Sequence, residues 1–210
     1  LIRRVKVTRG EMTFSLRCWP RFDYARKVPE VTVDGGVSTF RCGDFTLRLS
    51  GPVTFEKEDG GVSATFSLKA GETADFVLDG NDGDVWDKDA VSAAIADAIE
   101  YWQSWAKRST YTGRWRSSVT RSALALKLLT SQKNGSIAAA GTFGLPEAPG
   151  GPRNWDYRAT WIRDASFTIY ALMRLGYTEE AKAFTRWSAE RPGHGPDDGH
   201  LRIMYALDGG

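Results

Sequence analysis

Hydrophobic and polar residues alternate through residues 1–79. In EMTFSLRC the side chains of Met12, Phe14, Leu16 and Cys18 fall on one face, with polar side chains on the other. A period of two is typical of a half-buried β-strand. Two DGG triplets interrupt the alternation, and glycine tolerates the positive φ of tight hairpin turns. The pattern therefore predicts an antiparallel sheet, as part of an N-terminal β-sandwich.

The period then lengthens to that of a helix. Between residues 87 and 107, apolar residues recur at steps of three and four, which is one stripe of an amphipathic helix. The stripe contains Val91, Ala94, Ile95, Ala98, Ile99, Trp102 and Trp105. We predict three parts: a partial β-sandwich over residues 1–82, a linker helix within 83–110, and a helical domain over 111–210.

The helical domain shows three helical patterns and one long loop. The first pattern covers residues 115–132 and stops at Asn134-Gly135, and the loop after it, SIAAAGTFGLPEAPGGPR, holds three prolines and four glycines. A second pattern reaches Leu175, where Gly176 is expected to end the helix. Thr178 is expected to cap a third, with acidic residues in its first turn. Such a short turn predicts an antiparallel helix pair.

Composition excludes several classes of partner. Lys and Arg number 28 against 26 Asp and Glu, a net charge of +2, which does not suit a phosphate backbone. No apolar run reaches the roughly 20 residues that span a bilayer, and no charged-then-apolar leader opens the chain. We expect neither nucleic-acid binding nor membrane insertion. Oligomeric state stays open.

Cysteine and histidine placement gives no metal or cofactor motif. Cys18 and Cys42 lie outside any CxxC pair, so buried reduced thiols are favoured over a disulfide. His194 and His200 lack the helical spacing of zinc ligands, although nearby aspartates, Asp197 or Asp198, would allow a site. We expect no cofactor and no metal.

The densest chemistry lies in NWDYRATWIRDAS, which begins at Asn154. A neutral sugar offers hydroxyls and apolar C–H faces. Aromatic rings bind those faces, whereas arginine and carboxylate groups form strong charge-assisted hydrogen bonds to hydroxyls. Arg163 supplies donors and Asp164 acceptors, so the two would clamp neighbouring hydroxyls. The alternative is structural: the rings of Trp155, Tyr157 and Trp161 pack into the core, Asp164 caps a helix, and Arg163 pairs with Asp156.

RNWDYRATWIRDASFTIYALMRLG resembles the signature of glycoside hydrolase family 15, the glucoamylases and their bacterial relatives the glucodextranases and trehalases. SIAAAGTFGLPE and HLRIMYALDG resemble the flanking segments, and LIRRVKVTRGEMTFSLRCWPRFDYAR is similar to the family's N-terminal β-sandwich. The resemblance implies a β-sandwich, a linker helix and an (α/α)6 barrel. It also implies an inverting, exo-acting hydrolase that releases glucose from the non-reducing ends of α-glucosides or from trehalose. A cytoplasmic location in a bacterium is expected.

The resemblance also implies roles for single residues. Arg163 and Asp164 match the pair that grips the terminal glucose, Tyr157 matches a tyrosine beside the anomeric carbon, and Trp161 matches a pocket-wall tryptophan. Asn154 and Asp156 match supporting motif positions. The sequence alone leaves the glucosidic linkage open.

Inverting hydrolysis needs two carboxyl groups roughly 6.5–9.5 Å apart. Glu147, Asp156 and Asp164 are the candidates in this chain, but the resemblance places both catalytic glutamates beyond Gly210. We therefore expect no catalytic residue here, with Glu147 ordering its loop, and an internal fragment that is inactive alone. The alternatives are a non-catalytic sugar-binding or scaffold protein, and a structural helical repeat with chance aromatics.

Overall fold

The computed structural model describes the chain except for residues 24, 81–84, 142–144 and 192–200. The described residues form two compact units, residues 1–99 and 100–210. This division falls inside the long helix between them. The domain boundaries predicted from sequence, after residues 82 and 110, stay a prediction.

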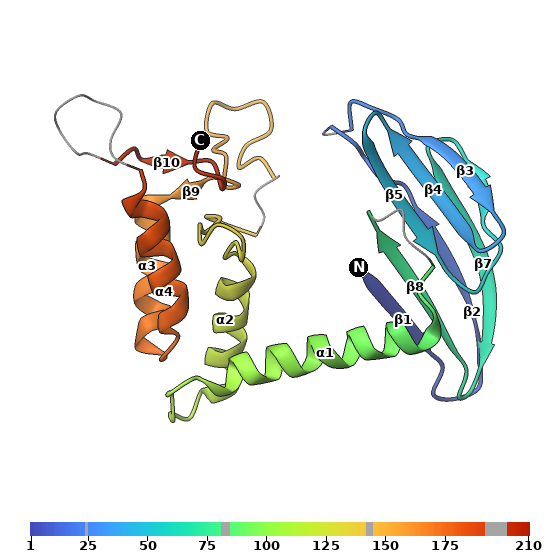
Figure 1. The fold of residues 1–210 in the computed structure, drawn as a ribbon, viewed down its shortest axis with the longest axis horizontal. Helices are drawn as coiled ribbons and strands as arrows, with labels where there is room; N and C mark the ends of the chain where they lie inside the picture. The colour runs from blue at the N-terminus through green and yellow to red at the C-terminus, as the bar shows by residue number, and fades with distance from the viewer. Residues whose placement is uncertain (24, 81–84, 142–144, 192–200) are drawn as a thin grey trace. The chain divides into compact units, whose positions relative to one another are not determined.

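The first unit is built from two antiparallel sheets (Figure 1). The five-stranded sheet, in the order β1-β8-β5-β4-β3, contains β1 Ile2–Lys6, β3 Glu30–Asp34, β4 Val37–Cys42, β5 Phe45–Ser50 and β8 Thr73–Asp79. The three-stranded sheet, in the order β2-β7-β6, contains β2 Glu11–Cys18, β6 Glu56–Glu58 and β7 Gly61–Lys69. The predicted antiparallel sheet is confirmed.

One hydrophobic core joins the two sheets. Phe40 from β4 and Val62 from β7 are both 0% exposed and belong to the same cluster. The rings of Phe66 on β7 and Phe76 on β8 lie 5.3 Å apart between their centroids. Residues of both sheets thus face one another, which is the arrangement of a sandwich. The predicted β-sandwich is confirmed.

Both DGG triplets form the predicted hairpin turns. Gly35 (φ 55°) connects β3 to β4, and Gly60 (φ 67°) connects β6 to β7. Positive φ explains the glycines, because other residues adopt this region at a steric cost. Cys18 and Cys42 are both free and half-buried, so the favoured prediction of reduced thiols holds.

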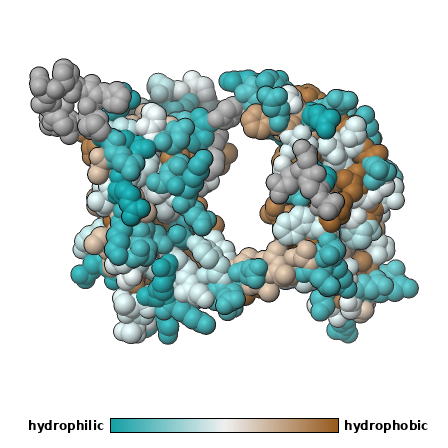
Figure 2. All heavy atoms as spheres, in the orientation of Figure 1, coloured by the Kyte–Doolittle hydropathy of each residue, from teal (hydrophilic) through white to brown (hydrophobic). Residues whose placement is uncertain are grey.

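The predicted linker helix is α1, Lys88–Lys107. Asp87 caps its start by accepting a hydrogen bond from the Ala90 backbone N–H at 2.7 Å. Val91 and Trp105, at the two ends of the apolar stripe, are buried, whereas Ile99 in its middle is 52% exposed. Figure 2 shows light-brown surface beside teal surface along this helix. None of the described helices is long and apolar enough to cross a membrane.

The second unit holds three further helices and one short sheet. They are α2 Arg116–Leu128, β9 Thr160–Trp161, α3 Ile162–Arg174, α4 Thr178–Ala189 and β10 Met204–Tyr205. Antiparallel sheets followed by helices confirm the predicted fold class, a β-sandwich and then the first helices of an (α/α)6 barrel.

The turn between α3 and α4 follows its prediction in one respect and departs in another. Gly176 has φ 92° and stands directly after the C-cap Leu175, as expected. The prediction that Thr178 caps α4 is wrong: Thr178 is the first helical residue, and the N-cap is Tyr177. Tyr177 is fully buried, and its hydroxyl donates to the Ala106 carbonyl at 3.1 Å, so packing selects this start.

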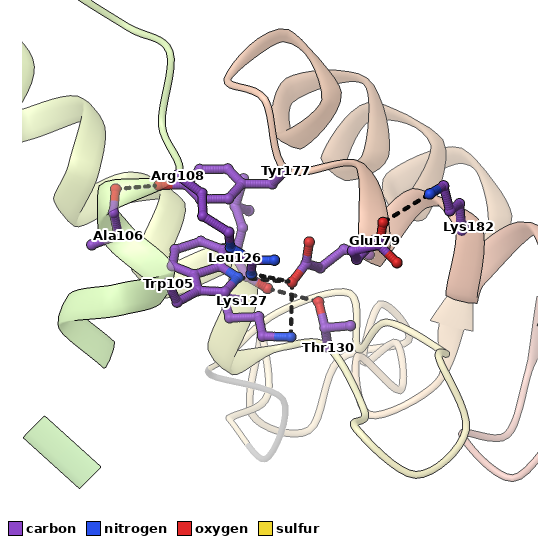
Figure 3. A network of polar contacts seen from close by, with 10 residues as sticks. Trp105, Ala106, Arg108, Leu126, Lys127, Thr130, Tyr177, Glu179 and Lys182 are labelled. Atoms are coloured by element: carbon purple, nitrogen blue, oxygen red, sulfur yellow. Dashed lines mark hydrogen bonds and ion pairs between the residues drawn. The ribbon is translucent and has the colours of Figure 1, made fainter. Parts of the chain in front are cut away.

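A buried carboxylate connects α1, α2 and α4, and Figure 3 shows its labelled partners Trp105 and Lys127. Glu180 on α4 is 3% exposed; its Oε1 accepts a hydrogen bond from Trp105 Nε1 on α1 at 2.7 Å and lies 2.9 Å from Lys127 Nζ on α2. The Trp105 ring stacks on Tyr177 with centroids 3.9 Å apart. Burial raises the pKa of Glu180, but the hydrogen bonds from Trp105 and Lys127 outweigh it, so the pKa lies below its usual value. This cluster ties α1, α2 and α4 together.

Candidate functional site

The stretch that begins at Asn154 ends in a sharp strand-to-helix transition. Thr160 and Trp161 form β9, which pairs with β10, and the Ile162 N–H donates to the Ile203 carbonyl at 3.1 Å. Thr160 is 0% exposed. The short sheet therefore fixes the backbone from which the next residues, Arg163 and Asp164, project at the start of α3.

Three aromatic rings cluster around Trp161. Tyr157 stacks on it at 6.2 Å between centroids with 25° between planes, and Trp155 meets it edge-on at 6.1 Å. Trp161 Nε1 donates to the Asp156 carbonyl at 3.0 Å, which fixes the indole. Trp155 is 52% exposed and the other two are half-buried.

These rings are not core residues. The neighbouring buried cluster is formed by Ile137, Ala165, Phe184, Trp187 and Tyr205, and none of the three rings belongs to it. The alternative prediction, that the rings pack into the core, is therefore wrong. They form a partly open apolar surface, which is the type of surface that binds the C–H face of a sugar.

Arg163 and Asp164 lie beside this surface and are bonded to each other. Arg163 Nη2 donates to Asp164 Oδ2 at 3.1 Å, and the side chains are 72% and 33% exposed. The guanidinium lies 5.9 Å from the Trp161 ring centroid. Donor and acceptor thus occupy adjacent positions next to an aromatic face, and both are reachable from solvent.

Asp164 is not the helix cap. It is the third residue of α3, and the N-cap is Trp161, whose extended backbone (φ −84°, ψ 121°) comes from pairing in β9. The Trp161 side chain makes no cap hydrogen bond. The alternative role predicted for Asp164 is therefore wrong, because the β9–β10 pairing sets where the helix begins.

Asp156 pairs with Arg158, and the alternative pairing with Arg163 is wrong. Arg158 Nε and Nη2 donate to the two carboxylate oxygens at 2.9 and 2.7 Å, and the Arg158 backbone N–H donates to Oδ1 at 3.0 Å. The side-chain hydrogen bonds from Arg158 hold the pKa of Asp156 below its usual value. Sequence reasoning missed Arg158, although an aspartate two residues before it is a common turn signal. Asp156 thus orders the turn beneath Trp161.

Asn154 organises the loop before it. Its amide nitrogen donates to the carbonyls of Ala148 and Gly151 at 3.2 and 2.9 Å, and its oxygen accepts from the Ala148 N–H at 3.3 Å. Glu147, the residue before Ala148, accepts a hydrogen bond from the Tyr157 hydroxyl. This bond is the main cause of a raised pKa for Tyr157; burial and the charges of Glu147 and Asp164 add to it, and Arg163 opposes it.

The predicted site residues are therefore brought together. Trp155 was named only as a core candidate, yet it forms one side of the ring cluster. No group of three or more His, Cys, Asp or Glu side chains within the described ranges is placed to hold a metal ion. The alternative metal site at His194, His200, Asp197 and Asp198 lies outside the described residues.

Comparison with known proteins shows what this chain is similar to. Residues 113–210 match the family model for glycosyl hydrolases family 15. A trehalase of Mycobacterium tuberculosis is 31% identical over 226 aligned residues, covering 100% of this chain and 32% of that protein. A trehalase of Thermoplasma acidophilum is 42% identical over 146 residues, covering 61% and 25%. The chain thus spans a third or less of these curated relatives. No solved structure matches it significantly.

Proposed function

We propose, from the premise that residues 113–210 belong to glycosyl hydrolases family 15, that this chain is part of an inverting, exo-acting α-glucoside hydrolase. One observation carries the proposal: a bonded, exposed Arg163–Asp164 pair stands beside the Trp161 ring, which offers both contacts that a glucose unit needs. The relatives are named trehalases, so trehalose is the first substrate to test.

The proposal gives each residue a physical role. Arg163 donates to one sugar hydroxyl and Asp164 accepts from its neighbour, while Trp161 and Tyr157 cover the apolar face. Asn154 and Asp156 support the site without touching the sugar, because the side chain of Asn154 bonds to the loop backbone and that of Asp156 bonds to Arg158 in the turn. Binding of the glucose unit is thereby separated from bond cleavage.

Cleavage is assigned to residues outside this chain. The family resemblance implies that the general acid and general base are two glutamates of later barrel loops, and the pairing of Asp156 with Arg158 supports this separation. The side-chain hydrogen bonds from Arg158 hold the pKa of Asp156 below its usual value, which makes Asp156 a poor proton donor. We therefore expect the 210 residues alone to bind sugar weakly and to release no glucose.

The first prediction concerns the substrate. The complete protein is expected to release glucose from at least one member of a panel of trehalose, α-1,4-linked glucan and α-1,6-linked dextran, with trehalose preferred. Glucose release measured for each substrate checks this. Binding of these sugars without any release would instead identify a non-catalytic sugar-binding protein and refute the hydrolase.

A further inference from the structure

We propose that Glu147 is a positioning residue of the same site. It holds the phenol of Tyr157 beside the Trp161 ring and keeps the hydroxyl proton of Tyr157 directed toward its own carboxylate. The effect of Glu147 on sugar binding rests on the proposed function. Its physical basis is independent of substrate: the hydrogen bond from the Tyr157 hydroxyl to the Glu147 carboxylate.

The loop that carries Glu147 is held on its C-terminal side. Asn154 makes three hydrogen bonds to the backbone of Ala148 and Gly151, immediately after Glu147. The Gly151 N–H also donates to the Ala148 carbonyl at 2.9 Å, closing a turn. Glu147 is therefore presented by an ordered turn, and the asparagine of the motif has a structural purpose: it fixes the loop that reaches Tyr157.

Tyr157 is fixed at its backbone and along its ring. Its carbonyl accepts the Ala139 N–H at 3.1 Å, and its ring stacks on Trp161. With the backbone and the ring fixed, what remains is the hydrogen bond of the phenol oxygen. Among the described residues, the hydrogen-bond partner of that oxygen is Glu147.

The charge of Glu147 determines what the phenol offers a ligand. A carboxylate accepts hydrogen bonds and donates none, so the Tyr157 proton points toward Glu147. The phenol oxygen then presents its lone pairs to the site as an acceptor. A sugar hydroxyl that donates a hydrogen bond is therefore favoured at this position. Glu147 thus sets the polarity of Tyr157 from the loop.

The test is the titration of Tyr157 in the complete protein without substrate. Carbon-13 NMR of the labelled phenol carbon follows ionisation, and Tyr157→Phe assigns the signal. Because Glu147 stabilises the neutral phenol, Glu147→Gln and Glu147→Ala are expected to lower the Tyr157 midpoint, with the larger decrease in Glu147→Ala, which also removes the acceptor. Glu56→Gln, an exposed carboxylate in β6 of the other unit, is the control and leaves the midpoint unchanged.

An unchanged Tyr157 midpoint in both Glu147 variants would overturn the inference. Glu147→Gln is nearly isosteric, so it reports even where Glu147→Ala fails to fold. The titration needs no substrate. If the protein hydrolyses no α-glucoside, the proposed function is refuted, but the titration still tests whether Glu147 acts on Tyr157. In an active protein, Glu147→Gln is further expected to raise KM more than it lowers kcat.

Discussion

Replacing Arg163 or Asp164 by alanine is expected to lower kcat/KM for the best α-glucoside by about 100-fold or more in the complete protein, with little loss of stability. A hydrogen bond to a charged group is worth about 1.5–3 kcal/mol, and both side chains are assigned hydroxyls of the reacting sugar. The fold depends little on the pair: Arg163 is 72% exposed, and an exposed ion pair contributes at most about 1 kcal/mol. Steady-state kinetics and thermal unfolding of the same preparations check both parts.

Arg174→Ala is the matched control, because Arg174 is another exposed arginine on α3, in its last turn. It is expected to retain wild-type kinetics. Wild-type kcat/KM in Arg163→Ala and Asp164→Ala would refute the clamp. A fall in kcat/KM that merely tracks a fall in unfolding temperature would assign the pair a structural role instead.

Replacing Glu180 by alanine is expected to destabilise the helical unit by about 3–5 kcal/mol, the usual cost of leaving one partner of a buried ion pair alone. Lys127 Nζ would lose the carboxylate at 2.9 Å, and Trp105 Nε1 its acceptor at 2.7 Å. Glu179→Ala is the control, because the neighbouring Glu179 is 62% exposed and pairs with Lys182 at the surface. Urea unfolding followed by tryptophan fluorescence gives both free energies.

The same carboxylate makes stability depend on pH. The pKa of Glu180 is lower in the folded protein than its usual value of about 4.3, so its contribution is present above that pH and is lost as pH falls through the folded pKa. The wild type should therefore lose part of its advantage over Glu180→Gln under acidic conditions. Equal costs for Glu180→Ala and Glu179→Ala, or an advantage independent of pH, would contradict this account of the cluster.

Local pattern was sufficient for the strands because the alternation in residues 1–79 and the two DGG turns are both local features. Helix ends were less predictable because distant pairing sets them. The pattern for α2 extends to Gln132, but the helix ends at Leu128, since Thr130 pairs with Ile137 and the Ser131 N–H donates to the Ser136 carbonyl. Each of these contacts competes with the next helical turn.

The clustering of the candidate residues was predictable from the sequence, whereas their hydrogen-bond partners were not, and their role in binding sugar stays a prediction. The crowd of rings and charges after Asn154 marked the residues, and the structure brings them together around Trp161. Their partners depend on features outside the motif: pairing with β10 makes Trp161 the helix cap. Glu180 shows the same limit, since sequence placed it at a helix start, where anions are favoured, whereas its partners come from α1 and α2.

The anomer of the glucose first released from trehalose by the complete protein tests the central claim most directly. Inverting hydrolysis forms β-glucose from the ring that water attacks and α-glucose from the leaving ring, so proton NMR in the first minutes should show equal amounts of the two anomers. The α-anomer alone would indicate a retaining mechanism. No glucose from trehalose or from any other α-glucoside of the panel would contradict the assignment of this chain to a hydrolase.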